Sequence, residues 1–276
     1  MKNFNQSPLP FQGQKRKFLK SFQTVLKQHL NSKMIYVDLF GGSGLLSHFV
    51  RQVYPEAVII YNDFDNYSER LKNVDNTNRL LDRLRVILNG YPDGKLISDP
   101  VRSQILELLK IETESGYVDF ITLSSSLLFS MNYATSLNDF YKTTFYNNIR
   151  KSNYEVAGYL DGIHIVNMDY KELFAKYRGR PDVVFLIDPP YLSTDAGTYT
   201  GYWKLKDYLD VLQTLNNTNY FYFTSNKSNI IELCDWLEKN MQAANPFNGA
   251  VKVEMGTQLT RNARYTDIML YKIKGQ

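Results

Sequence analysis

Four consecutive residues, Asp188, Pro189, Pro190 and Tyr191, carry the chemistry that this sequence suggests most clearly. They follow the apolar run Val183–Ile187, which is typical of a buried strand. Each proline fixes φ at about −65° and removes a backbone donor, so the carbonyls before them stay free to accept hydrogen bonds. A carboxylate, free carbonyls and an aromatic ring at the mouth of a strand can hold a flat ring that carries an amine. The alternative is a strand that simply ends in a Pro-Pro turn.

A glycine-rich segment, Phe40–Gly44, could bind a nucleoside. Glycines let the backbone pass close to a ligand, and this segment leads into a predicted helix N-terminus. Asp63 lies 19 residues beyond Gly44, at the end of the next apolar run, where an acidic side chain can accept hydrogen bonds from ribose hydroxyls. A dinucleotide fingerprint would have glycine or alanine where this chain has Ser47, so hydride transfer is disfavoured.

A third segment, Pro10–Lys15, places an aromatic residue, a glycine and a lysine before the first predicted helix. The lysine could reach a ligand carboxylate. A solvated lysine at the start of a helix is the competing interpretation.

The elements that must position these segments follow from hydrophobic periodicity. Apolar runs predict strands, and the 3.6-residue pattern predicts helices. Strands are expected over 34–40, 57–61, 163–167, 183–187 and 220–224, helices over about 14–31, from 45 onward, 169–177, 204–215 and 228–241, and a closing hairpin over 250–255 and 267–273. This order predicts an α/β fold with an open, parallel nucleotide-binding sheet.

The alternation of strands and helices stops between the second and third strands, where residues 65–160 show a polar helical pattern. We therefore expect one catalytic domain formed by residues 1–64 and 161–276. Residues 65–160 are expected to form a helical insertion.

The composition excludes several classes of protein. The chain has 276 residues, 43% of them hydrophobic, as in a soluble globular enzyme. It has no apolar run of about 18 residues and no apolar signal-peptide core, so we expect a cytoplasmic protein with no membrane partner. The single cysteine, Cys234, fits a packed thiol on a helix. One cysteine and three scattered histidines give no recognisable ligand spacing, so no metal is expected.

The formal net charge of +4 permits a polyanionic partner without requiring one. The basic residues form separate clusters that could meet phosphates if folding gathers them on one side. They lie at Lys15–Lys17, Arg79–Arg85, Arg150–Lys151 and Arg261–Arg264.

The order Pro-Phe-x-Gly-x-Lys, Phe-x-Gly-x-Gly, helical insertion and Asp-Pro-Pro-Tyr resembles the Dam-type DNA adenine-N6 methyltransferases, in which target recognition lies between the cofactor and catalytic motifs. The resemblance spans nearly the full chain. It implies a Rossmann-like class I methyltransferase sheet, mostly parallel with an antiparallel C-terminal strand, plus an inserted helical target-recognition domain.

The resemblance also implies the site. The cofactor would be S-adenosylmethionine, and the reaction would transfer its methyl group to the exocyclic N6 amine of a flipped-out adenine. The catalytic residues would be Asp188, Pro189, Pro190 and Tyr191. The cofactor would be bound by Phe11, Gly13, Lys15, Asp38, Phe40, Gly42, Gly44, Asp63, Asp169 and Asp188.

DNA contacts are expected from the insertion and from two later segments. The insertion candidates are Asn132, Lys142, Asn147, Asn148, Arg150 and Lys151. Tyr199, Tyr202 and Trp203 could surround the flipped base, or pack in the core. Arg261, Asn262 and Arg264 could line the DNA path, or form an ordinary basic turn. The insertion lacks the glycine-, Phe-Asn- and Pro-containing stretch of enzymes that read GATC, so that specificity does not follow.

The implied partner is double-stranded DNA bound by a monomer, and a cognate restriction endonuclease from a restriction–modification system stays open as a second partner. Two other functions also stay open. One is methylation of RNA or a protein glutamine, although glutamine enzymes usually carry Asn-Pro-Pro-Tyr. The other is a DNA-binding relative that has lost catalysis, although every residue of the catalytic motif is present.

Overall fold

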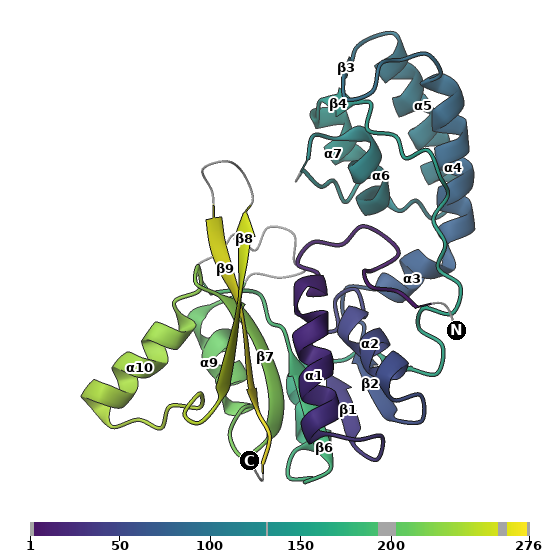
Figure 1. Ribbon diagram of the computed structural model, residues 1–276. Helices are drawn as coiled ribbons and strands as arrows, with labels where there is room; N and C mark the ends of the chain where they lie inside the picture. Colours follow the sequence, from purple (N-terminus) through teal and green to yellow (C-terminus); the bar gives the residue numbers. More distant parts are fainter. Residues whose placement is uncertain (1–2, 131, 193–202, 259–263, 275–276) are drawn as a thin grey trace.

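The structure is a computed structural model that describes residues 3–130, 132–192, 203–258 and 264–274. Its main sheet has seven strands in the order β5-β2-β1-β6-β7-β9-β8 (Figure 1). The strands are β1 (Ile35–Asp38), β2 (Val58–Asn62), β5 (His164–Val166), β6 (Val183–Ile187), β7 (Asn219–Ser225), β8 (Val251–Gln258) and β9 (Arg264–Lys272).

The first five strands of this order are parallel, and β9 pairs antiparallel with both β7 and β8. The predicted sheet, mostly parallel with an antiparallel C-terminal strand, is therefore confirmed. Because β1 pairs with β2 on one side and with β6 on the other, the strand order reverses at β1. In open α/β sheets, ligands bind beyond the carboxyl ends of the strands at such a switch point.

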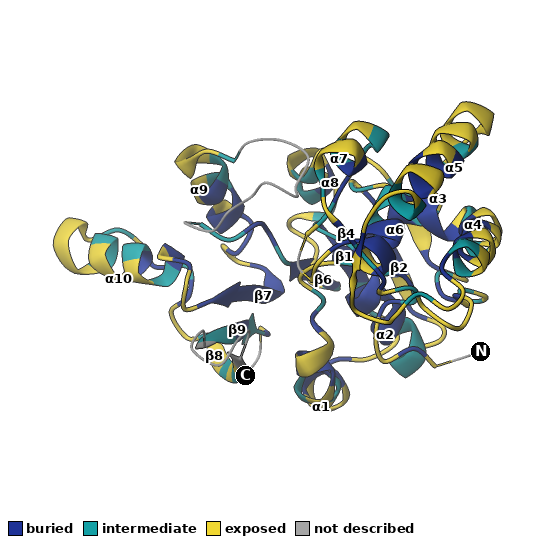
Figure 2. Ribbon diagram, turned by 90° about the horizontal axis from the view of Figure 1, so that it is seen from above, coloured by how far each residue is buried: buried dark blue, intermediate teal, exposed yellow. Residues whose placement is uncertain are grey.

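Helices cover both faces of the sheet. This arrangement agrees with β6, whose alternate side chains pack on opposite faces. Val184 and Leu186 pack in a core with α1 and α2, whereas Phe185 and Ile187 pack in a second core with α8, α9 and α10. Successive side chains of a strand point to opposite faces, so a strand buried on both sides is apolar throughout. The helices are α1 (Leu19–His29), preceded by the short 3₁₀ helix η1 (Arg16–Phe18), α2 (Leu45–Val53), α8 (Tyr170–Tyr177), α9 (Leu205–Gln213) and α10 (Ile230–Met241). Figure 2 shows the central strands β1, β6 and β7 largely buried and the outer helix faces exposed.

The segment between β2 and β5 forms a separate lobe above the sheet in Figure 1. It contains α3 (Tyr67–Lys72), α4 (Val74–Ile87), α5 (Val101–Ser115), α6 (Phe120–Leu127) and α7 (Leu137–Lys142). Its apolar core also takes in Phe4 and Leu9 from the N-terminal segment. The predicted helical insertion is present. It also contains a two-stranded sheet of β3 (Leu96–Ile97) and β4 (Phe145–Tyr146), whose two-residue strands are too short for a periodicity to predict.

None of the helices in the described part of the chain is long and apolar enough to span a membrane.

Candidate active site

A cavity of about 290 Å³ lies where β1, β2 and β6 end, close to the volume range of small-molecule sites. It therefore lies at the switch point of the sheet. It is lined by Phe11, Gln12, Gly13, Leu39, Phe40, Gly41, Gly42, Asn62, Phe64, Asp65, Asp169, Tyr170, Lys171, Asp188, Pro190, Trp203 and Asp207.

The glycine turn after β1 lines this cavity. Residues larger than glycine do not fit in the turn. A Cβ on Gly41 would lie 2.1 Å from the Tyr61 ring and 2.8 Å from the Asn62 carbonyl oxygen. Gly42 has a φ of +49°, and a Cβ there would lie 3.0 Å from the Phe11 ring. Both positions therefore require glycine, which keeps the backbone open toward a ligand.

Asp188 follows β6 and borders the cavity with its side chain one-fifth exposed. The ammonium of Lys15 lies 2.5 Å from Asp188 Oδ2 and also donates to the Gly13 carbonyl oxygen at 2.7 Å. Burial raises the pKa of Asp188, while the nearby Lys15 ammonium opposes that rise. The carboxylate is thus partly paired and still faces the cavity.

Asp38, at the end of β1, is a buried carboxyl group that is only 1% exposed. Its Oδ2 accepts a hydrogen bond from Ser47 Oγ at 2.8 Å, whereas Oδ1 has no hydrogen-bond partner among the described residues. Burial raises the pKa of Asp38 to about 7 against the effect of the Ser47 hydrogen bond, and the charge of Asp188 adds to the rise. This carboxyl therefore gains or loses its proton near neutral pH.

The acid predicted for ribose binding, Asp63, does not line the cavity. Its Oδ1 accepts from the Tyr67 backbone N–H at 2.6 Å and the Tyr61 hydroxyl at 3.0 Å, and its Oδ2 accepts from the Ser68 backbone N–H at 2.8 Å. These bonds satisfy the free amides at the start of α3. Asp65, two residues later, is the acid of this segment that borders the cavity.

Aromatic rings and acids also line the cavity. The rings of Phe40 and Tyr170 have centroids 4.9 Å apart, and Trp203 lies 5.8 Å from Phe40. Asp169 is the N-cap of α8 and accepts a hydrogen bond from the Lys171 backbone N–H at 2.7 Å. In total four aspartates and one lysine line the cavity, which favours a ligand that carries positive charge.

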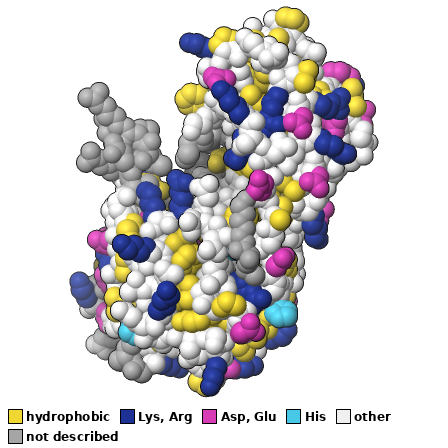
Figure 3. Space-filling view, turned by 45° about the vertical axis from the view of Figure 1, so that its right-hand side comes forward, with side chains coloured by type: hydrophobic (Ala, Val, Ile, Leu, Met, Phe, Trp, Pro, Cys, Tyr) yellow, Lys and Arg dark blue, Asp and Glu magenta, His cyan; other side chains and the backbone are white. Residues whose placement is uncertain are grey.

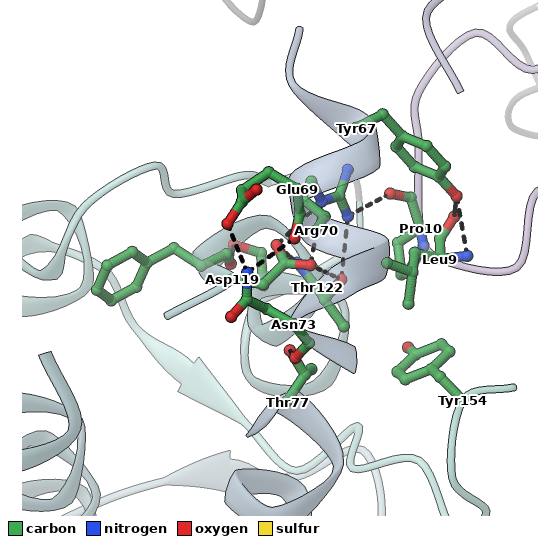
Figure 4. Close-up of polar contacts among 12 residues, drawn as sticks. Leu9, Pro10, Tyr67, Glu69, Arg70, Asn73, Thr77, Asp119, Thr122 and Tyr154 are labelled. Atoms are coloured by element: carbon green, nitrogen blue, oxygen red, sulfur yellow. Dashed lines mark hydrogen bonds and ion pairs between the residues drawn. The ribbon is translucent and has the colours of Figure 1, made fainter. Parts of the chain in front are cut away.

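The N-terminal segment that supplies Phe11 and Gly13 is held by the insertion (Figure 4). Arg70 donates from Nη2 to the Pro10 carbonyl oxygen at 2.8 Å and from Nε to both oxygens of Asp119, at 3.1 and 3.0 Å. The Tyr67 hydroxyl bonds the backbone of Leu9, accepting at 3.0 Å and donating at 3.2 Å. Hydrogen bonds from Arg70 and Tyr67 therefore tie the insertion to the segment at the edge of the cavity, and the buried pair with Asp119 holds Arg70 in place.

The structure brings together most of the predicted site residues. Those that line the cavity are Phe11, Gly13, Phe40, Gly42, Asp169, Asp188, Pro190 and Trp203. Those that lie outside its lining are Lys15, Asp38, Gly44, Asp63, Pro189 and Tyr191. Lys15 nevertheless contacts Asp188 directly, and its ammonium lies 5.4 Å from the centre of the Tyr191 ring.

Several lining residues were not singled out from the sequence. They are Leu39, Asn62, Phe64, Asp65, Tyr170, Lys171 and Asp207. A signal existed for Asn62 and Asp65, because both flank the end of the second predicted strand. For Asp207, which lies on α9, the sequence offered none that we recognise.

The predicted DNA contacts have mixed outcomes. Asn132 and Lys142 are exposed on the insertion. Arg150 lies over the Tyr154 ring, and Lys151 pairs with Asp93 at 3.0 Å, both at the surface. Asn147 is buried and donates to the Tyr91 carbonyl oxygen at 2.8 Å, so its proposed DNA contact is wrong.

The remaining DNA-contact candidates precede α9, precede β9 or lie at the start of β9 in the sequence. Tyr199, Tyr202, Arg261 and Asn262 lie outside the described residues, and only the backbone of Arg264, at the start of β9, is placed. On the face in Figure 3, Lys and Arg side chains lie on both the insertion and the catalytic body, with acidic side chains among them on the insertion. On this face the basic clusters do not merge into one continuous patch.

The strand order, the glycine turn and an Asp-Pro-Pro-Tyr motif at one cavity define a Rossmann-like methyltransferase. A family model described as D12 class N6 adenine-specific DNA methyltransferase matches residues 11–223, and the chain belongs to that family. The chain is also 37% identical over 279 residues to a Haemophilus influenzae protein named as a provisional methyltransferase, covering 98% of this chain and 93% of that protein.

Solved structures add less. The chain matches a provisional rRNA methylase from Clostridium thermocellum with a TM-score of 0.36 and 9% identity, covering 92% of this chain and 97% of that one. It matches an rRNA methylase from Streptococcus thermophilus with a TM-score of 0.34 and 12% identity, covering 93% of this chain and 97% of that one. Similarities at this level carry no argument about substrate.

Proposed function

We propose that this methyltransferase transfers the methyl group of S-adenosylmethionine to the exocyclic N6 amine of an adenine in DNA. One observation carries the proposal. Asp188 and Pro190 of the Asp-Pro-Pro-Tyr motif line the same cavity as the glycine turn at Gly41 and Gly42. A nucleoside-like cofactor and a flat, amine-bearing base would therefore meet at one point.

The residues of the cavity fit this cofactor. Gly41 and Gly42 line the cavity and carry no side chain, so their backbone can come into close contact with a nucleoside. The three lining aspartates other than Asp188 suit a ligand with a sulfonium and an ammonium group. We assign ribose binding to Asp65, because the oxygens of Asp63 already bond the start of α3. The aromatic wall of Phe40 and Tyr170 offers an apolar surface for the adenine ring of the cofactor.

S-adenosylmethionine, when bound, supplies an electrophilic methyl group. Asp188 would then orient the nucleophile. The N6 lone pair of adenine is delocalised into the ring, and a hydrogen bond to a carboxylate favours the form in which that lone pair is available. Lys15 occupies Oδ2 of Asp188, while Oδ1 receives no hydrogen bond from any described residue and is the proposed acceptor. Positioning of the reacting atoms to about 3 Å supplies much of the rate.

The target adenine would have to leave the duplex, because its N6 amine is paired and stacked inside it. Flipping costs a few kcal/mol, which stacking and hydrogen bonds in the pocket offset. Tyr191, which follows the two prolines, is the proposed stacking partner. In this account a monomer acts on double-stranded DNA, and the insertion selects the site.

A direct substrate comparison tests the proposal. The protein is incubated with methyl-labelled S-adenosylmethionine and, in separate reactions, with unmethylated duplex DNA, RNA and a protein extract. The proposal predicts label in DNA, recovered as N6-methyladenine after digestion to nucleosides. Label found only in RNA or in protein glutamine would replace this substrate assignment, and DNA binding without any label would indicate a DNA-binding relative that has lost catalysis.

A further inference from the structure

A second cavity, of about 340 Å³, lies in the insertion at the loop between α6 and α7. In Figure 1 this loop lies on the side of the insertion that faces the β8–β9 hairpin. The cavity shares no lining residue with the first one. It is therefore a separate site that the transfer chemistry does not use.

An exposed aromatic ring borders this second cavity. Phe129 directly follows the buried Leu128, yet it is itself 60% exposed. Its ring meets the Tyr146 ring at a centroid distance of 5.6 Å and an angle of 61°. The two rings make a corner against which a planar group can pack, and covering Phe129 would remove apolar surface from water.

The same cavity presents polar groups that the fold leaves unused. Among the described residues, none forms a hydrogen bond with the side chains of Ser130, Asn132 or Tyr133. An amide and two hydroxyls can both donate and accept. No charged residue is part of the described lining, so the cavity lacks the cations that a phosphate group would need.

We propose that this cavity holds a nucleobase of the bound DNA other than the adenine to be methylated, packed on Phe129 and hydrogen-bonded by Asn132. The inference rests on the proposed function, in which the insertion selects the site in DNA. A neutral, planar ring with hydrogen-bonding edges matches the aromatic corner, the unused polar groups and the lack of charge. Since the site is concave, the base must project from the duplex to enter it. The cavity is thus a determinant of the recognition sequence.

Photochemical crosslinking tests where the base lies. Thymines of a duplex substrate are replaced one at a time by 5-iodouracil, the full-length protein is added, and crosslinked peptides are mapped by mass spectrometry after irradiation. The proposal predicts that at least one substituted duplex crosslinks to Phe129, Tyr133 or Tyr146. Methyl transfer into the same duplexes is measured in parallel. Efficient methylation with crosslinks only elsewhere would overturn the cavity assignment alone. Crosslinking at the cavity without methylation would support it and contradict the proposed function. The absence of both would overturn both.

Two variants sharpen the test. Phe129→Ala is expected to raise the KM for DNA about tenfold, since base–aromatic packing contributes roughly that much, and to leave cofactor affinity unchanged. Tyr117→Ala is the matched control, because Tyr117 is a 42% exposed aromatic residue of the same insertion that does not line the cavity. Asn132→Ala removes an exposed side chain and should relax the sequence preference of the methylated sites at one position. Wild-type KM in Phe129→Ala together with wild-type preference in Asn132→Ala would also overturn the proposal.

Discussion

The Lys15 ammonium lies 2.5 Å from Asp188 Oδ2, although the two residues are far apart in the sequence. Lys15 precedes the first helix, whereas Asp188 follows the central strand β6. The contact offsets part of the cost of burying the carboxylate. In the proposed mechanism the other oxygen of Asp188 accepts from the substrate.

Replacing Lys15 by methionine should shift the acid limb of the pH–rate profile. In the proposed mechanism the ionised form of Asp188 is the active one, and Lys15 holds the pKa of this carboxyl below the value that burial alone would give. Without the ammonium the pKa rises, so kcat/KM should begin to fall at a higher pH than in the wild type. The measurement is methyl transfer to DNA from pH 5 to about 9. Lys15→Arg keeps the charge and serves as the control, and an unmoved acid limb in Lys15→Met would contradict the pairing.

Asp38→Asn should change how stability depends on pH. The pKa of Asp38 is about 7 in the folded protein against an ordinary value of 3.8, so the folded state binds more protons between these values. The contribution of Asp38 to stability is therefore fully present below about pH 4 and is lost as pH rises through 7. The loss is of the order of 4 kcal/mol, and it should be missing in the variant. Urea unfolding of both proteins at several pH values measures it, and parallel curves would refute the assignment.

The two acids after β2 should separate into a binding and a structural residue. Asp65→Asn should weaken S-adenosylmethionine binding about tenfold, as for a lost hydrogen bond to a charged group, with little effect on stability. Asp63→Ala should cost about 2 kcal/mol in the free energy of unfolding, because the first amides of α3 lose their acceptor. Calorimetric titration and chemical unfolding give the two quantities. If cofactor binding weakened in Asp63→Ala and stability fell in Asp65→Asn instead, Asp63 would be the ribose-binding residue.

Arg70→Met should destabilise the protein by about 3 kcal/mol or more, because it leaves Asp119 buried without its partner. It should also weaken cofactor binding, since the Pro10 carbonyl loses the donor that holds the Phe11 segment in place. The matched control is Arg83→Met, which removes an exposed pair with Glu112 and should cost less than about 1 kcal/mol. Similar losses in the two variants would show that the buried pair has no special role.

The strands of the main sheet and the main motif could be predicted from local pattern. An apolar run followed by Asp188 and two prolines ends a buried strand, and glycines after Asp38 open a turn, whatever the rest of the chain does. The short strands of the insertion could not be found, because two paired residues have no periodicity.

The choice between Asp63 and Asp65 needed tertiary information. Both acids follow the same strand, and the direction in which α3 leaves the sheet decides which one meets its amides. The pairing of Lys15 with Asp188 is likewise a product of folding, because no spacing in the sequence relates the two. Asn147 illustrates the same limit, since burial alone separates it from its exposed neighbour Asn148.

The most direct test of the central claim is the yield of N6-methyladenine in duplex DNA with wild-type protein and with Asp188→Ala, measured together with the affinity of each for S-adenosylmethionine. The account predicts N6-methyladenine from the wild type, none from the variant, and cofactor affinities that agree closely. Undiminished methylation by the variant, or an equal loss of methylation and cofactor binding, would contradict the role assigned to Asp188.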